Sequence, residues 1–425
     1  MTTARTRREA IVAVTLTALL MWGLIAHLRS APAELHLGAV YPQRGALGAA
    51  ATDEGLGIRV AVDLQNALGG VDGHRIALDA RDVSTVDEAA PAIAALAAGG
   101  APAVLGAYAS DLSMVASAEA ARHGLVYWEA GAVADRITER GLPGVFRVGA
   151  TGGVLGSNSV RFAAEQLAPR LARPVTSLRV AIVRADDLYA RSVADAADSQ
   201  ARALGMQVVG TSTYSLLDPT FAGAVADIAA ERPDVLVLSS HVPDGVAFRE
   251  AFLAAGLHVG ALIGSTMAEC GPDFGAMLGP DAVGVFASDR PGSGFDPAHL
   301  PGAARADYDR LAAAWAAERG GTAPTEEGLA GFSAAWALVH TVLPAAARSG
   351  GLTAAGIAAA ARAVDLPTGS LPDGAGIHFS GSGDTLGQNQ RSSAVVWQWQ
   401  GVRRSVVVWP AVWATGSVQM VPLPR

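Results

Sequence analysis

Short apolar runs alternate with helix-period segments from residue 35 onward. Apolar residues in strand-like runs occur at Leu35–Tyr41, Arg75–Asp82, Ala103–Gly106 and Leu125–Trp128. Segments with apolar residues at helical spacing separate these runs, at Glu54–Leu68, Asp87–Ala98 and Leu112–His123. Alternation of strand and helix favours parallel strands joined by right-handed crossovers. The first part of the chain therefore predicts an α/β lobe around a parallel sheet.

The same alternation begins again after a proline-marked loop at Arg173–Pro174. The strands predicted for this second set are Arg179–Val183, Gln207–Thr211, Asp234–Ser239 and Ala261–Gly264. The predicted helices are Arg191–Leu204, Phe221–Glu231 and Gly245–Ala255. Two sets of similar size predict an α/β protein with two doubly wound parallel-sheet lobes and a cleft between them.

The last third of the chain contains fewer predicted strands. Ser288–Ala303 and Asp365–Asp373 are rich in Gly, Pro and Asp, which is typical of connections. Helical patterns return at Ala304–Arg319 and Glu327–Ala347. A hairpin around a glycine is predicted from the runs Ala394–Gln400 and Ser405–Trp409.

Polar residues follow the predicted strands at the edge where a ligand cleft would form, because open α/β sheets bind ligands at the carboxyl ends of their strands. Tyr108 and Ser110 follow the strand at 103–106. Ser110 either caps the next helix or offers its hydroxyl to an anionic group such as a carboxylate, and the two roles are compatible. Three strands of the second set are each followed by polar residues that favour a cleft wall: Tyr189, His241, Thr266 and Glu269.

Composition excludes several classes of function. The net charge of −8 argues against a nucleic-acid partner, and all 31 basic residues are arginine, so no lysine can form a Schiff base or a P-loop contact. The single cysteine, Cys270, excludes an intramolecular disulfide and disfavours a cysteine-based zinc site. Neither Gly-x-Ser-x-Gly nor His-Glu-x-x-His occurs. We therefore expect a protein that is not an enzyme and uses no cofactor or metal.

The N-terminal segment predicts export. Arg5, Arg7 and Arg8 precede an apolar run, Ala10–Leu28, which is close to the roughly 20 residues needed to span a bilayer. Ala31–Ala33 offers small residues for cleavage. Residues 1–33 are therefore either a cleaved signal peptide or a retained membrane anchor, and both place the body of the protein outside the cytoplasmic membrane.

The chain resembles the periplasmic solute-binding proteins of the leucine/isoleucine/valine type, whose relatives bind short amides and urea. The most specific block is Asn66 with Gly69–Val71 and Gly73. Other matching segments occur in the expected order, at Leu37–Pro42, Asp79–Asp82, Leu105–Ser110, Phe146–Arg147, Arg179–Val183, Tyr189, Gly376–Phe379 and Val395–Trp399. The resemblance extends from Leu35 to the C-terminus.

The resemblance implies roles for the candidate site residues. Ser110 matches the family's serine that holds the ligand's α-carboxylate, and Tyr189 matches a tyrosine of the second lobe. Gly131, Ala132 and Val133 match a first-lobe segment that usually carries a hydroxyl, so an amide or urea-like ligand stays open beside an amino acid. His241 falls where branched-chain binders carry another aromatic residue. The acid that holds an α-ammonium aligns near Thr266, with Glu269 following.

The resemblance also implies a fold of discontinuous lobes. It assigns residues 34–149 with 288–364 to lobe one and 150–287 with 365–425 to lobe two. The three hinges are expected near Arg147–Thr151, Ala287–Arg290 and Val364–Leu371. A ligand would close the lobes, and the closed form, expected to be a monomer, would deliver it to an ABC permease. The alternative is a ligand-sensing extracellular domain that is anchored by Ala10–Leu28.

Overall fold

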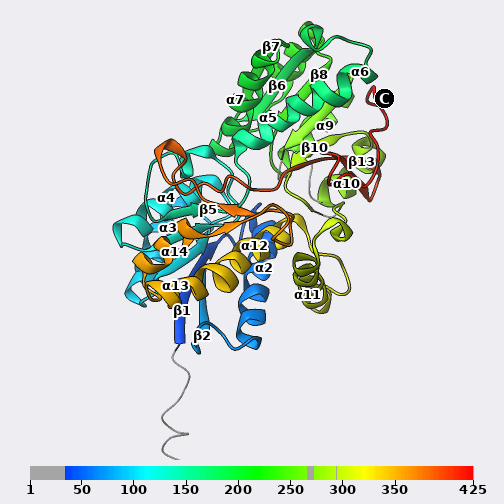
Figure 1. The fold of residues 1–425 in the computed structure, drawn as a ribbon. Coiled ribbons are helices and arrows are strands. Elements are labelled where there is room, and N and C mark those ends of the chain that lie inside the picture. The colour runs from blue at the N-terminus through cyan, green and yellow to red at the C-terminus, as the bar shows by residue number, and fades with distance from the viewer. Residues whose placement is uncertain (1–33, 266–271, 293, 425) are drawn as a thin grey trace, which may run out of the picture.

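Figure 1 shows the computed structural model, which describes residues 34–265, 272–292 and 294–424 and consists of two α/β lobes. The predicted export segment, residues 1–33, lies outside the described residues, as do Thr266 and Glu269. The alternation of strand and helix patterns predicted both lobes, because helices cover the two faces of a mostly parallel sheet.

The first lobe contains a parallel sheet in the order β2-β1-β3-β4-β5. Its strands are β1 (Glu34–Tyr41), β2 (Arg75–Asp82), β3 (Ala103–Gly106), β4 (Val126–Glu129) and β5 (Val145–Arg147). The helices of its first half are α2 (Gly48–Ala67), α3 (Val86–Ala98) and α4 (Ser110–Arg122). Helix α2 begins six residues before the predicted Glu54, because its first turns consist of small residues without a helical apolar period.

The second lobe contains a seven-stranded sheet in the order β14-β13-β10-β9-β8-β6-β7. Its strands are β6 (Arg179–Ala185), β7 (Gln207–Tyr214), β8 (Val235–Ser239), β9 (Ala261–Ser265), β10 (Phe286–Asp289), β13 (Val395–Gly401) and β14 (Arg404–Trp409). Strands β13 and β14 form the predicted antiparallel hairpin, and β13 pairs antiparallel with β10. Strand β10 was not predicted, because its last two residues were assigned to the Gly- and Pro-rich connection Ser288–Ala303.

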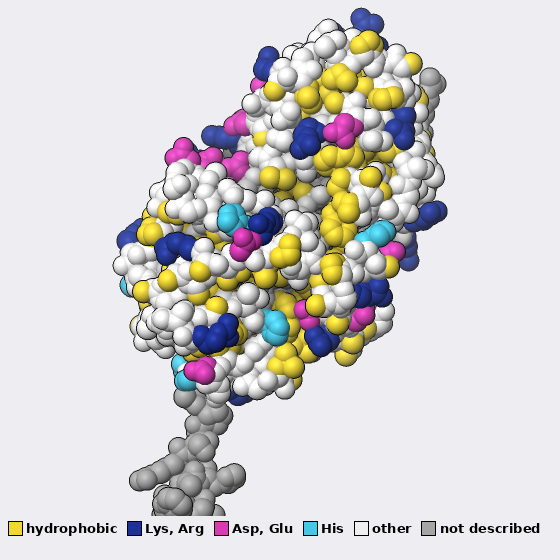
Figure 2. Space-filling view, in the orientation of Figure 1, with side chains coloured by type: hydrophobic (Ala, Val, Ile, Leu, Met, Phe, Trp, Pro, Cys, Tyr) yellow, Lys and Arg dark blue, Asp and Glu magenta, His cyan; other side chains and the backbone are white. Residues whose placement is uncertain are grey.

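The helices of the second lobe are α5 (Gly152–Phe162), α6 (Ala168–Arg170), α7 (Leu188–Ala203), α8 (Ala222–Glu231), α9 (Asp244–Ala254) and α10 (Pro272–Leu278). The remaining elements are α11 (Gly302–Glu318), α12 (Glu326–Trp336), α13 (Leu343–Ser349), α14 (Ala354–Ala363) and the strand pair β11 (Asp365–Leu366) and β12 (Ile377–His378). On the face drawn in Figure 2, acidic and arginine side chains are scattered and intermixed over both lobes.

Within the described residues the chain passes between the lobes three times. The first passage joins β5 to α5. The second lies in α11, since Ala304 belongs to the core of the second lobe while Leu311 and Trp315 belong to that of the first. The third precedes β13, because Phe379 still packs in the first-lobe core, with its ring centroid 5.3 Å from that of Trp128.

These passages correct two of the expected lobe boundaries. Residues 295–304 were expected in lobe one, but Phe295 and Leu300 pack in the second-lobe core. Residues 371–379 were expected in lobe two, but Leu371 and Ile377 pack in the first-lobe core. The Gly- and Pro-rich composition of these two segments predicts irregular structure. It does not show whether their few apolar side chains pack in the core of the first lobe or of the second.

Helices α2 and α12 pack closely in the first lobe, and glycines make that approach possible. A Cβ atom on Gly57 would lie 2.1 Å from the carbonyl oxygen of Gly328, and one on Gly331 would lie 2.2 Å from that of Glu54. The segment Glu326–Ser349 is long and apolar enough to cross a bilayer, but most of it is buried inside the lobe. The structure uses it as a core helix.

Substituting Gly57→Ala is expected to lower the stability of the first lobe by about 1–3 kcal/mol, because the added methyl group forces two helix backbones apart. Thermal unfolding followed by circular dichroism measures the effect. The matched control is Gly223→Ala in α8, where a Cβ atom has open space. Equal melting temperatures for the two variants would contradict this account of the helix pair.

Candidate functional site

A cavity of about 390 Å³ lies between the two lobes at the carboxyl ends of their strands. This is the volume range of small-molecule sites in proteins. The predicted site residues that line it are Tyr108, Ser110, Gly131, Val133, Tyr189 and His241. Ala132 lies between two lining residues and is 3% exposed. The structure thus brings together, from both lobes, most of the residues that the sequence singled out.

Ser110 stands at the start of α4 on the first-lobe wall. The preceding turn reverses the chain through Tyr108, which has a φ of +67°, a conformation that non-glycine residues rarely adopt and that is frequent at functional sites. The Ser110 hydroxyl does not cap the helix; its oxygen accepts a hydrogen bond from the Ala134 backbone N–H at 3.2 Å. Its own proton can then be donated into the cavity.

The loop after β4 forms the floor of the cavity, and its shape is held by two charged side chains. The Glu129 carboxylate accepts hydrogen bonds from the N–H groups of Gly131 at 3.0 Å and Ala132 at 2.8 Å. Arg290 Nη1 donates to the carbonyl oxygens of Ala130 at 3.2 Å and Gly131 at 3.0 Å. The backbone N–H groups of Gly131 and Ala132 therefore already have an acceptor.

Arg290 follows β10 and was missed by the sequence reading, which assigned it to a connection. Its side chain is 5% exposed, and its Nε lies 2.5 Å from the Glu326 carboxylate at the start of α12. Burial by itself lowers the pKa of Arg290, but the charges of Glu326 and Asp289 outweigh burial and raise it. This cation joins the second-lobe sheet to two elements of the first lobe.

The second-lobe wall includes two aromatic side chains, Tyr189 and His241, each of which is held by a polar contact to another residue. The Tyr189 hydroxyl donates to the Ser265 carbonyl oxygen at 2.9 Å, and its ring meets that of His241 edge to face at 5.0 Å. His241 Nε2 lies 2.8 Å from the carboxylate of Asp187, which also caps α7 by accepting from the Ala190 N–H at 2.7 Å. Although burial lowers the pKa of His241, the neighbouring Asp187 raises it overall.

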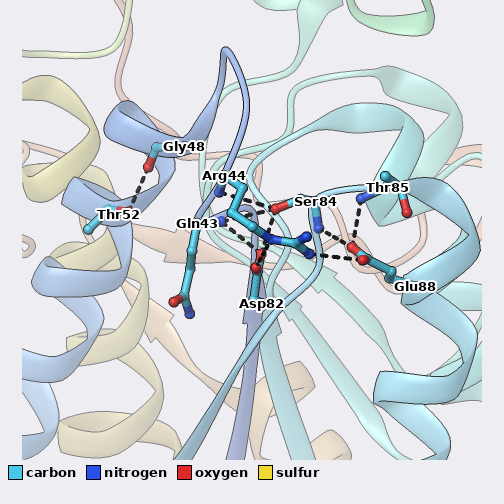
Figure 3. Close-up of polar contacts among 8 residues, drawn as sticks. All are labelled: Gln43, Arg44, Gly48, Thr52, Asp82, Ser84, Thr85 and Glu88. Carbon is cyan, nitrogen blue, oxygen red and sulfur yellow. Dashed lines mark hydrogen bonds and ion pairs between the residues drawn. The ribbon is translucent and has the colours of Figure 1, made fainter.

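Ser84 and Thr85 line the cavity on the first-lobe side. Figure 3 shows the polar contacts that hold their turn. The Glu88 carboxylate accepts hydrogen bonds from the N–H groups of Ser84 at 2.8 Å and Thr85 at 3.1 Å. Arg44 pairs with both Asp82 and Glu88. Since Arg44 is mostly exposed, these pairs stabilise the turn only weakly.

Glu54 lies beneath the cavity floor, completely buried. A Cβ atom on Gly131 would lie 1.9 Å from its Oε2, and neither carboxylate oxygen has a hydrogen-bond partner in the described part of the chain. Burial, and then the charge of Glu129, raise the pKa of Glu54 well above its ordinary value. The folded protein therefore favours the protonated form of Glu54 more strongly than the unfolded chain does. Across the described ranges, no group of three His, Cys, Asp or Glu side chains is arranged to hold a metal ion.

Comparison with known proteins gives a consistent result. A family model described as periplasmic binding protein matches residues 34–396. The Leu/Ile/Val-binding protein homolog 7 of Brucella melitensis is 28% identical over 415 residues, which cover 95% of this chain and 98% of the relative. These matches confirm the family resemblance stated from the sequence.

Solved structures match the fold over nearly their whole length. LivJ, a branched-chain amino acid transporter substrate-binding protein from Streptococcus pneumoniae in complex with isoleucine, superposes with a TM-score of 0.71 at 20% identity, covering 89% of this chain and 100% of LivJ. A solute-binding protein of an ABC transporter from R. palustris, in complex with benzoate, gives 0.70 at 19% identity, covering 92% and 100%. The predicted two-lobe fold is confirmed.

Substituting Glu54→Gln is expected to flatten the dependence of stability on pH. A carboxyl group whose pKa is raised by folding contributes stability that is fully present below about pH 4.5 and is lost as the pH rises through its folded pKa. From this group the wild-type protein loses up to about 1.4 kcal/mol per pH unit over that range, whereas glutamine does not titrate. Melting temperatures measured from pH 4 to 9 follow the loss.

The matched control for this substitution is Glu250→Gln at an exposed position of α9. Its melting curve against pH is expected to run parallel to that of the wild type. If the Glu54→Gln curve were also parallel, burial would not raise the pKa of Glu54.

Proposed function

Because this chain belongs to the periplasmic binding protein family, we propose that it is an extracytoplasmic receptor that clamps a small amino acid-like ligand between its two lobes. It is a solute-binding protein of an ABC transporter and not an enzyme. The observation that carries the choice of ligand size and type is the cavity of about 390 Å³ with polar groups on both walls. A ligand held at Ser110 reaches Tyr189 and His241 only when the lobes are together.

Ligand binding is expected to close the two lobes because the ligand stabilises the closed conformation. The first-lobe wall offers the Ser110 hydroxyl at the N-terminus of a 13-residue helix, which favours a carboxylate. The second-lobe wall adds aromatic surface from Tyr189, and Leu216 and Val133 add apolar area. A ligand that contacts both walls binds the closed form more tightly than the open form. This difference in affinity shifts the equilibrium between the two forms toward the closed one.

The partners follow from this function. The closed protein would act as a monomer and deliver its ligand to an ABC permease in the membrane, with no role for nucleic acid. Residues 1–33 would direct export and would be either cleaved or kept as an anchor. The scattered charges on the face in Figure 2 are consistent with a protein that does not bind the phosphate backbone of a nucleic acid.

A ligand panel tests the proposed function. Thermal unfolding of the purified protein would be followed with leucine, isoleucine, valine, the other amino acids, urea and short amides. A ligand present at about 100 times its dissociation constant adds roughly 2.7 kcal/mol of stability. We expect a clear rise in melting temperature with amino acids. If no member of the panel shifted the melting temperature, the proposed ligand class would be wrong.

Substituting Ser110→Ala is expected to weaken binding of the panel's best ligand at least about tenfold, because one charge-assisted hydrogen bond to a carboxylate is lost. Isothermal titration calorimetry measures the affinity. Ser199→Ala, on the exposed side of α7, is the matched control and should bind as the wild type does. Unchanged affinity in a folded Ser110→Ala protein would remove Ser110 from the site.

A further inference from the structure

The first turn of α7 presents side chains in two directions at the cleft. Asp187, which caps the helix, and Tyr189 line the ligand cavity. Leu188 stands between them in the sequence, yet among the described residues it is not part of the cavity lining. It packs instead against the first-lobe core cluster that contains Leu112 and Ala132. A leucine of the second lobe therefore crosses to the first lobe directly beside the ligand cavity.

Ser192 makes a second contact between the lobes. It follows Leu188 by one helical turn, so both side chains lie on the same side of α7. The Ser192 hydroxyl donates to the Asp135 carboxylate at 2.8 Å and accepts from the Asp135 backbone N–H at 3.1 Å. The same carboxylate accepts from the Gly153 N–H at 3.2 Å, at the start of α5. Asp135 of the first lobe thus binds two helices of the second.

The first lobe returns this contact through Val133. Its side chain is 3% exposed and belongs to the core cluster of the second lobe. Its carbonyl oxygen accepts from the Gly152 N–H at 2.6 Å. Each lobe therefore places one apolar side chain, Val133 or Leu188, against the apolar cluster of the other. Separating the lobes would expose both side chains to water, which costs free energy in proportion to the apolar area uncovered.

The two contacts of α7 lie at different distances from the hinge. The first passage between the lobes enters α5 at Gly152, and a Cβ atom there would lie 2.6 Å from the Ser192 hydroxyl oxygen. Ser192 is therefore close to the point about which the lobes rotate. Leu188 lies four residues, or about 6 Å along the helix axis, farther toward the cavity. A rotation that opens the cleft consequently moves Leu188 away from the first lobe more than it moves Ser192.

We propose that Leu188 and Ser192, the interlobe face of α7, set the affinity for the ligand by stabilising the closed arrangement of the lobes, although neither side chain contacts the ligand. This inference rests on the proposed function, since it concerns how tightly the same cavity holds its ligand. The two residues are positioning residues, because they act through Asp187 and Tyr189, which the same helix turn carries into the cavity wall.

The effect on affinity follows from the population of the closed form. A ligand that needs both walls binds with an apparent dissociation constant equal to the intrinsic constant divided by the closed fraction. Loss of the interlobe face lowers that fraction without altering any contact between protein and ligand. The weaker binding is therefore expected in the dissociation rate, because opening releases the ligand, while the open form still captures it at an unchanged rate.

The test uses variants of the full protein in matched pairs. Leu188→Ala removes the apolar contact, and Leu188→Met keeps a side chain of similar volume. The control for leucine truncation is Leu68→Ala, an exposed position of the first lobe. Ser192→Ala removes both hydrogen bonds to Asp135, and its control is Ser199→Ala on the exposed side of the same helix. Circular dichroism verifies that each variant is folded.

Two measurements are made on each variant. Surface plasmon resonance gives association and dissociation rates for L-leucine, or for whichever member of the panel stabilises the wild type most. Small-angle X-ray scattering gives the radius of gyration with and without that ligand. A side chain that only supports the local fold would change the melting temperature but neither the dissociation rate nor the radius of gyration.

We expect Leu188→Ala to raise the dissociation rate by about three- to tenfold, the factor that corresponds to burial of about half a leucine side chain, and to change the association rate by less than about twofold. Its radius of gyration without ligand should exceed that of the wild type, and saturating ligand should abolish the difference. Leu188→Met should restore wild-type rates. Ser192→Ala should show a smaller rise, because Ser192 lies nearer the hinge, and both controls should behave as the wild type.

Different outcomes separate the two proposals. An unchanged dissociation rate in folded Leu188→Ala, or a loss of affinity that resides in the association rate alone, overturns the role of the interlobe face and leaves the receptor function in place. If the wild type bound no member of the panel, the proposed ligand class would be wrong. The scattering comparison without ligand would then decide the inference by itself, and equal radii of gyration for the wild type and Leu188→Ala would overturn it.

Discussion

The buried guanidinium of Arg290 is the interaction on which the arrangement of the site depends. It lies at the end of a strand of the second lobe, yet it donates to the carbonyl oxygens of Ala130 and Gly131 and pairs with Glu326, all of the first lobe. A buried cation is stable only when such partners surround it, and removing one partner of a buried pair is strongly destabilising. The position of the two lobes and the shape of the cavity floor are therefore set by the same group.

The first lobe buries several carboxyl groups around the single guanidinium of Arg290. Glu54 and Glu129 are completely buried near Arg290, and Glu326 and Glu327 at the start of α12 are almost so. Burial raises the pKa of each of these carboxyl groups, so part of the cluster holds protons. Burying a charged group without a full set of partners lowers the stability of the fold. Clusters of buried ionisable groups with shifted pKa values are typical of functional sites.

The fold and the ligand are decided by different residues. Solved structures with this fold hold isoleucine in one case and benzoate in another, at similar TM-scores. Parallel strands and their crossovers create the cleft in every case, and the choice of ligand then depends on a few polar groups at the strand ends. In this chain the polar residues that line the cavity include Ser110 and Asp111 on one wall and Asp187 with His241 on the other.

The sequence by itself determined the two lobes, most helices and strands, and the side chains of Ser110, Tyr189 and His241 at one edge, because these depend on hydrophobic period and on the strand ends. It did not predict strand β10, and it did not predict that Arg290 and Asp111 line the cavity. It also assigned residues 295–304 and 371–379 to the wrong lobes. Those features depend on which core a loop's few apolar side chains enter and on which charges meet across the cleft. Such contacts join residues far apart in the chain, so only the tertiary structure decided them.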